Sequence, residues 1–167
     1  MRDAFARLGG FDVSSFEFSP VLALTDHTAH YRNKVQLPVG LDADGHVVTG
    51  FYAGRTHRIV PCPDCKLQPE WMNALARRAC ALLEANGIAP YDEETGKGRV
   101  RHLYMRPGWP SGPRLLCFVV NGNGLPNEAE ICRTLQQAFQ LTTVLITRHT
   151  TRPNALLGRA TRPVPGH

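Results

Sequence analysis

Hydrophobic and polar residues follow two different periods along this chain, and each period predicts one type of element. Segments with the spacing and composition of strands are 31–40, 46–52, 56–60, 99–106, 115–120, 142–147 and 154–157. The turn residues at 42–45 join the first two of these as a hairpin. The Pro- and Gly-rich stretch 107–113 joins the fourth and fifth as a second pair.

Helical spacing appears in two longer segments and in one short one. The clearest covers 69–86, where the apolar face consists of Met72, Leu75, Ala76, Ala79, Leu82 and Leu83. Pro69 suits the first turn of this helix and Gly87 its end. A second helix is predicted to start at Asn127 with a capping box completed by Glu130. Residues 2–8 resemble the end of a helix stopped by paired glycines.

The order of these elements predicts the fold class. Hairpins outnumber parallel crossovers, so we expect an α+β fold with a largely antiparallel sheet and the two main helices packed on one face. The length of 167 residues suits a single domain covering 1–167.

Charge is distributed unevenly along the chain. Residues 1–94 carry 9 Lys and Arg against 12 Asp and Glu, whereas residues 95–167 carry 10 against 2. Such a field attracts polyanions, of which nucleic acid is the commonest in the cytoplasm. The alternative is a soluble domain whose excess of arginine has no partner.

The basic residues form clusters next to aromatic ones. Arg99 and Arg101 are predicted to share one strand face, as are Arg32 and Lys34, so each pair could present its cations to phosphates. The full predicted RNA-binding set is Arg32, Lys34, Arg55, His57, Arg58, Arg99, Arg101, His102 and Arg106. Neighbouring rings that could stack on unpaired bases are Tyr31, Tyr52, Tyr104 and Trp109. The alternative is a set of solvated strand faces whose rings turn into the core.

Five cysteines and no secretion signal favour reduced thiols. Cys62 and Cys65 have the spacing of a metal-binding pair or a redox pair. A structural zinc site needs four ligands, however, and the sequence contains no second pair of cysteines at this spacing. We find no nucleophile elbow, metalloprotease or P-loop motif. No apolar run reaches the roughly 18 residues of a membrane helix, so the predicted location is the cytoplasm, with no membrane partner.

An ordered series of short motifs resembles the bacterial RNA uracil-C5 methyltransferases, which include the RumA-type 23S ribosomal RNA enzymes and the TrmA-like transfer RNA enzymes. The matching stretches are 31–34, 50–52, 56–60, 65–68, 98–103 and 156–159, and the series extends along nearly all of the chain. The resemblance implies that this chain is the central RNA-facing domain of such an enzyme. In the family, that domain lies between an N-terminal segment with a TRAM module and a C-terminal Rossmann-type domain. It also implies ribosomal RNA in preference to transfer RNA, and the other domains of the same polypeptide as partners.

By the same resemblance, Cys65 matches the fourth ligand of a 4Fe-4S cluster whose other three cysteines lie upstream and are absent from this chain. The S-adenosylmethionine pocket, the cysteine nucleophile and the general base would belong to the C-terminal part. We therefore expect a fragment that helps to position RNA for methylation of a uridine and is inactive alone. The alternatives are a free-standing RNA-binding or adaptor module, a small metal or redox protein built on Cys62 and Cys65, or a domain that mainly bridges its neighbours.

Overall fold

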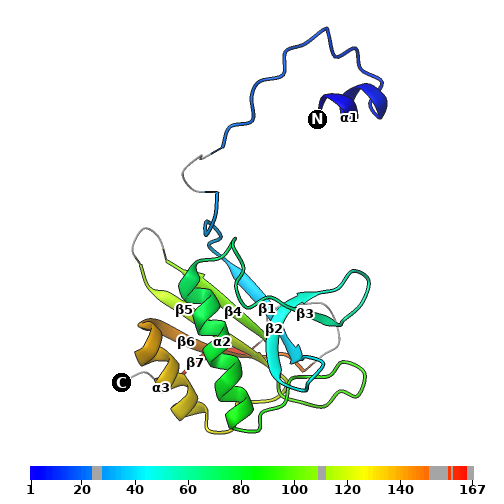
Figure 1. The fold of residues 1–167 in the computed structure, drawn as a ribbon. Helices are drawn as coiled ribbons and strands as arrows, with labels where there is room; N and C mark the ends of the chain where they lie inside the picture. The colour runs from blue at the N-terminus through cyan, green and yellow to red at the C-terminus, as the bar shows by residue number, and fades with distance from the viewer. Residues whose placement is uncertain (24–27, 109–111, 151–157, 159, 165–167) are drawn as a thin grey trace.

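The predicted α+β class is confirmed: a mixed sheet carries its two main helices on one face (Figure 1). The computed structural model describes residues 1–23, 28–108, 112–150, 158 and 160–164. Its strands are β1 (Val35–Leu41), β2 (Val47–Tyr52), β3 (Ile59–Pro61), β4 (Val100–Pro107), β5 (Arg114–Val120), β6 (Leu141–Arg148) and β7 (Ala160–Pro163).

The strands lie in the order β3-β2-β1-β4-β5-β6-β7. Neighbouring strands are antiparallel throughout, except for β5 and β6, which run parallel because the helix between them carries the chain back to the same end of the sheet. The short strands β3 and β7 form the two edges of this sheet.

The core lies between the sheet and the helices α2 (Glu70–Ala85) and α3 (Glu128–Phe139). Leu37, Leu103 and Phe118 alternate inward from neighbouring strands and are fully buried. Leu75 of α2 and Leu135 of α3 belong to the same apolar cluster. The apolar helix faces that the residue spacing predicts therefore pack against the sheet. None of the helices in the described part of the chain is long and apolar enough to cross a membrane.

Element ends depart from the sequence predictions at three places. Residues 31–34 lie outside β1, because the chain before this strand bonds to the 66–67 segment, where Arg32 N–H donates to Leu67 O over 2.9 Å. Residues 56–58 form part of a turn, so β3 starts later than predicted. The predicted strand 154–157 lies outside the described residues, and β7 was not predicted.

The predicted capping box at the start of α3 is wrong. Asn127 makes no capping hydrogen bond; its backbone is left-handed (φ 50°) and its side-chain amide donates to Asn86 Oδ1 over 2.8 Å. The carboxylate of Glu130 pairs with Arg133 one turn later. Glu128 supplies a side-chain hydrogen bond at the start of α3 instead, because its Oε2 accepts from Leu125 N–H over 3.1 Å.

Gln140 ends α3 in the left-handed conformation (φ 52°, ψ 45°), which favours glycine. Gln140→Gly should therefore raise the free energy of unfolding by about 1 kcal/mol in denaturant titrations. Gln137→Gly, placed inside the same helix, should lower it by about 1 kcal/mol. Equal effects of the two substitutions would contradict the assignment of the helix end.

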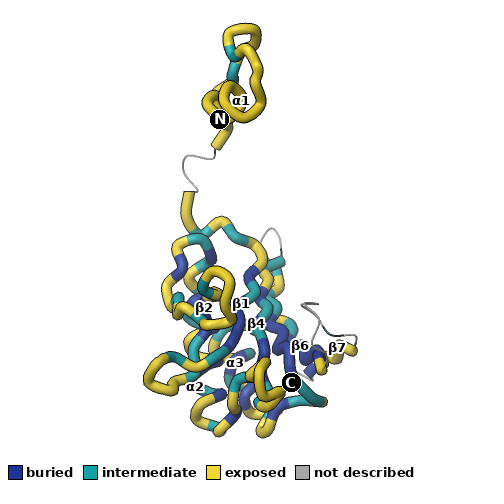
Figure 2. Tube along the Cα trace, turned by 90° about the vertical axis from the view of Figure 1, so that its right-hand side faces the viewer, coloured by how far each residue is buried: buried dark blue, intermediate teal, exposed yellow. Residues whose placement is uncertain are grey.

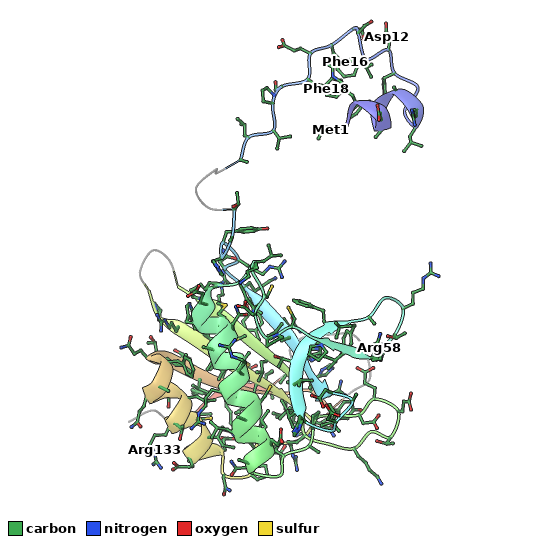
Figure 3. The ribbon with its side chains drawn as sticks, viewed as in Figure 1. Met1, Asp12, Phe16, Phe18, Arg58 and Arg133 are labelled. Carbon is green, nitrogen blue, oxygen red and sulfur yellow. The ribbon has the colours of Figure 1, made fainter. Side chains whose placement is uncertain are left out.

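Residues 1–23 stand away from the sheet in Figure 1 and add no residue to the core. This segment contains α1 (Arg2–Arg7) and a small aromatic cluster, in which the ring of Phe5 lies 5.6 to 6.0 Å from those of Phe11, Phe16 and Phe18. Figure 3 shows Phe16 and Phe18 beside α1, and Figure 2 shows that most of the segment is exposed. The predicted N-terminal helix is confirmed.

Candidate nucleic-acid interface

A cleft of about 820 Å³ opens where β1 ends and β4 begins, beside the turn that joins β2 to β3. Two loops form its sides: the turn between β2 and β3, and the segment that leads into β4. Its charged and aromatic lining residues are Tyr52, Arg55, His57, Arg58, Tyr91, Asp92, Glu93, Glu94, Arg101 and His102. Five of the residues predicted from the sequence therefore meet here, namely Arg55, His57, Arg58, Arg101 and His102.

The 53–58 turn projects two arginines beside the cleft. Ala53 N–H donates to Arg58 O over 2.9 Å, and Thr56 N–H donates to Ala53 O over 3.0 Å, which closes the turn. Arg55 occupies its tip with φ +61°, a left-handed conformation that costs a non-glycine residue roughly 1–2 kcal/mol. Arg55 and Arg58 are both exposed, and Figure 3 shows Arg58 at this margin of the molecule.

The 92–97 loop on the other side carries three carboxylates. Asp92 Oδ1 accepts from Glu94 N–H over 2.8 Å and from Thr95 N–H over 3.3 Å, and these bonds hold the pKa of Asp92 below its ordinary value. Gly98 follows with φ +91° and packs against the carbonyl of Pro90 so closely that a side chain there would collide with it. The loop is therefore closed by backbone contacts, leaving Glu93 and Glu94 to face the cleft.

His57 and Glu93 connect the two sides of the cleft through an ion pair between Nδ1 and Oε2. The ring of His57 also lies against Tyr52, with centroids 5.4 Å apart and planes tilted by 38°. Burial, with a smaller contribution from Glu93, raises the pKa of the Tyr52 hydroxyl, so this phenol stays protonated at neutral pH. Even so, Tyr52 remains 42% exposed.

Arg101 does not share a strand face with Arg99, so the prediction that these two guanidiniums lie on one face is wrong. The register of β4 on β5 shifts between Val100 and His102, so Arg101 is the extra residue of a β-bulge. Its side chain is only 6% exposed, and the guanidinium carbon lies 3.8 Å from the centre of the Tyr91 ring. Arg99 precedes β4, and its guanidinium donates to Asn121 O over 3.0 Å.

His102 lies on β4 opposite Pro38, and because the next residue, Leu103, points into the core, the His102 side chain lies on the other face of the sheet. Burial, reinforced by the positive charge of Arg101, lowers the pKa of His102 to about 4. This imidazole is therefore neutral at physiological pH and can act on RNA only as a hydrogen-bonding group.

The remaining predicted cations lie at the opposite end of the same two strands. Lys34 precedes β1, so the prediction that it shares a strand face with Arg32 is wrong. Val35 is paired with Met105, which brings Lys34 and Arg106 to the same end of the sheet. Because β1 covers seven residues, this end lies about 20 Å from the cleft. The cations thus form two groups, one at each end of β1 and β4.

Cys65 is buried, and its backbone is fixed by Asn73, whose side chain accepts from Cys65 N–H over 3.2 Å and donates to Cys65 O over 3.1 Å. Cys62 is partly exposed nearby, and burial raises the pKa of its thiol. Among the described residues, no three His, Cys, Asp or Glu side chains gather as a metal site requires. A 4Fe-4S cluster takes four cysteine thiolates, so the described residues could supply Cys65 as one ligand but not the full set.

Sequence reasoning missed Tyr91 and the three carboxylates of the cleft, Asp92, Glu93 and Glu94. Tyr91 gave no signal, because it lies in a loop and reaches the sheet through one bond from its N–H to Val100 O over 2.8 Å. Glu93 looked like part of a solvated charge run. Of the predicted stacking rings, Tyr31 is 61% exposed outside the cleft, Tyr104 lies on β4, and Trp109 falls outside the described residues.

The chain is similar in sequence to proteins named RNA methyltransferases. It is 38% identical to an uncharacterized RNA methyltransferase of Gloeobacter violaceus, over 99% of this chain and 36% of that protein. Uncharacterized RNA methyltransferases of Nostoc sp. and Clostridium tetani are 34% and 31% identical, over 98% and 95% of this chain and 35% and 34% of their own lengths. The chain thus spans about a third of the length of these relatives. No protein-family model matches it.

One solved structure shares the fold. The Pyrococcus abyssi tRNA (uracil-54, C5)-methyltransferase, solved in complex with S-adenosyl-L-homocysteine, superposes with a TM-score of 0.62 over 80% of this chain and 31% of that one. The sequences are 15% identical, so this likeness shows a common fold and nothing more.

Proposed function

We propose that this chain is the central, RNA-binding domain of a longer S-adenosylmethionine-dependent RNA methyltransferase that acts on C5 of a uridine. The observation that carries the proposal is the similarity to proteins named RNA methyltransferases along nearly the whole chain, at 38% identity in one case. The relatives' names support RNA as the partner. We place the target in 23S ribosomal RNA, in preference to transfer RNA, on the sequence motifs.

The two groups of cations support this role. Arg55 and Arg58 lie at the cleft, and Arg106 with the residues before β1 lies at the far end of the same strands. A single RNA strand crossing this face could contact both groups, because about 20 Å corresponds to only a few nucleotides. Arg101 and His102 would then support the cleft from its floor, and Arg99 would stabilise the start of β4 through Asn121 O, instead of binding phosphates.

The chemistry of methylation would come from the rest of the polypeptide. S-adenosylmethionine, the nucleophile and the general base belong to that part in our proposal, as do the cysteines that would join Cys65 around a 4Fe-4S cluster. The chain would work in the cytoplasm, next to those domains. The contribution of this chain itself would be to bind RNA.

Arg55 allows an unusually clean test of RNA binding. Arg55→Gly removes the guanidinium and also relieves the left-handed backbone, so the variant should be as stable as the original or up to about 1 kcal/mol more stable. Combined with Arg58→Ala, it should weaken RNA binding on the order of tenfold and reduce the slope of log K against log salt by about 1.4, the value for two contacts to a single strand. Fluorescence anisotropy between roughly 50 and 200 mM salt measures both quantities.

Arg133→Ala is the matched control, because Arg133 is an exposed arginine on α3, far from Arg58 in Figure 3. Its loss should change neither the affinity nor the salt slope by a comparable amount. If the control and the double variant weaken binding equally, the cleft is not a specific contact. If the unaltered chain binds no RNA at low salt, the proposed function is wrong.

A further inference from the structure

The charges around the cleft do not suit a channel for phosphates. The lining contains the three arginines Arg55, Arg58 and Arg101, and against them the three carboxylates Asp92, Glu93 and Glu94. The arginines of the 53–58 turn and the carboxylates of the 92–97 loop come from different sides. Carboxylates repel a phosphate backbone, so an RNA strand is attracted to the turn and kept away from the loop.

Tyr52 offers the aromatic surface of the cleft. The Tyr91 ring is already covered by the guanidinium of Arg101 at 3.8 Å, which makes Tyr91 a support for that arginine. Tyr52, by contrast, is 42% exposed at the end of β2, and its orientation is held by the ring of His57. His57 is itself held by Glu93. A planar group could therefore stack on a ring that is fixed in advance.

On these grounds, and resting on the proposed RNA-binding function, we propose that the cleft binds one unpaired nucleotide whose base carries an exocyclic amino group. The base stacks on Tyr52, its phosphates face Arg55 and Arg58, and its amino group donates to the carboxylates of the 92–97 loop. The cleft volume of about 820 Å³ lies within the range of small-molecule sites.

The carboxylates of the 92–97 loop make this site select between bases. Cytosine and uracil share one ring frame, but cytosine presents an amino donor at the position where uracil presents a carbonyl acceptor. A carboxylate at that position accepts a hydrogen bond from the cytosine amino group and repels the uracil carbonyl, which leaves uracil only its ring N3–H as a donor. The site therefore favours cytidine over uridine, and the cleft would read a position beside the methylated base instead of the methylated base itself.

The test uses the full chain and oligouridine RNAs of about nine nucleotides, within the footprint of single-strand binding sites, with either cytosine or uracil at the central position. The cytosine oligonucleotide should bind about fivefold more tightly in competition anisotropy. The double variant Glu93→Gln, Glu94→Gln should bring this ratio close to unity, although both affinities rise as negative charge is removed. Glu130→Gln on α3, an exposed carboxylate away from the cleft, should leave the ratio unchanged.

A second measurement tests the stacking directly. With 2-aminopurine at the central position, binding should quench its fluorescence when the base stacks on Tyr52. Tyr52→Phe should preserve this quenching, and Tyr52→Leu should abolish it while salt-dependent binding persists, since only the aromatic face is lost.

The outcomes separate this inference from the proposed function. Equal affinities for cytosine and uracil, or quenching that survives Tyr52→Leu, would overturn the nucleotide site while leaving RNA binding intact. Absence of binding to every oligonucleotide would overturn both. Selectivity that disappears with the carboxylates, together with quenching that requires an aromatic ring, supports the site.

Discussion

Replacing Gly98 with alanine should lower the free energy of unfolding by about 3 kcal/mol, a large part of the stability of a typical domain. The residue has φ +91°, and an added Cβ would strike the carbonyl oxygen of Pro90 and approach Tyr91 Cα to 2.9 Å. Both obstacles are backbone atoms, which cannot swing away as the end of a side chain can. Urea titration followed by circular dichroism measures the loss.

Gly96→Ala separates the collision from the backbone strain. Gly96 also has a positive φ, +71°, but an added Cβ meets no described atom within 4 Å. This variant should lose only about 1 kcal/mol, the cost of the left-handed conformation. Equal losses at the two positions would mean that the contact with Pro90 does not constrain the chain. Gly98→Ala should also weaken RNA binding, because Pro90 and Tyr91 line the cleft.

Stability should fall by about 3 kcal/mol as the pH is lowered from 6.5 to about 4, through the titration of His102. The unfolded chain takes up this proton near pH 6.5, whereas burial and the charge of Arg101 delay uptake in the folded chain until about pH 4. The stability of the folded chain is therefore unaffected by the titration of His102 above pH 6.5, and it decreases as the pH falls from 6.5 to about 4. Unfolding curves at several pH values measure the change.

His102→Gln should flatten this part of the pH profile, since glutamine does not titrate. His46 provides the contrast: its hydrogen bond with Glu84 raises the pKa of the imidazole, so the stability it contributes is present below pH 6.5 and is lost as the pH rises through the folded value. His46→Gln should therefore change the slope in the opposite sense. Parallel profiles for the original chain and His102→Gln would refute the prediction.

Periodicity was enough to predict the described elements except β7, but not the cleft. The apolar stripe of α2 and the paired strands β4 and β5 follow from side-chain spacing, because packing against one core imposes that spacing. The cleft depends on two loops far apart in the sequence, and loops carry no periodic signal. Nothing in the sequence reveals that the 53–58 turn and Glu93 approach each other across the end of the sheet.

Arg101 shows why a strand pattern can mislead. The two-residue rule places Arg99 and Arg101 on one exposed face, but the bulge at Arg101 interrupts the alternation and buries the guanidinium against Tyr91. A double alanine substitution at these two positions would test stability instead of RNA contact, since Arg99 also donates to Asn121 O. Bulges depend on the pairing of two strands, which a single sequence does not display.

The two edge strands also govern how copies of this chain meet one another. An open edge presents unpaired backbone groups to which a strand of another molecule can add, and this is a common start of aggregation. Here β3 covers three residues and β7 four, and both end in a proline, Pro61 and Pro163, which lacks the N–H that a new strand would need. Within the part of the chain that the structure describes, the seven-stranded sheet is thereby discouraged from adding a strand of another copy at either edge.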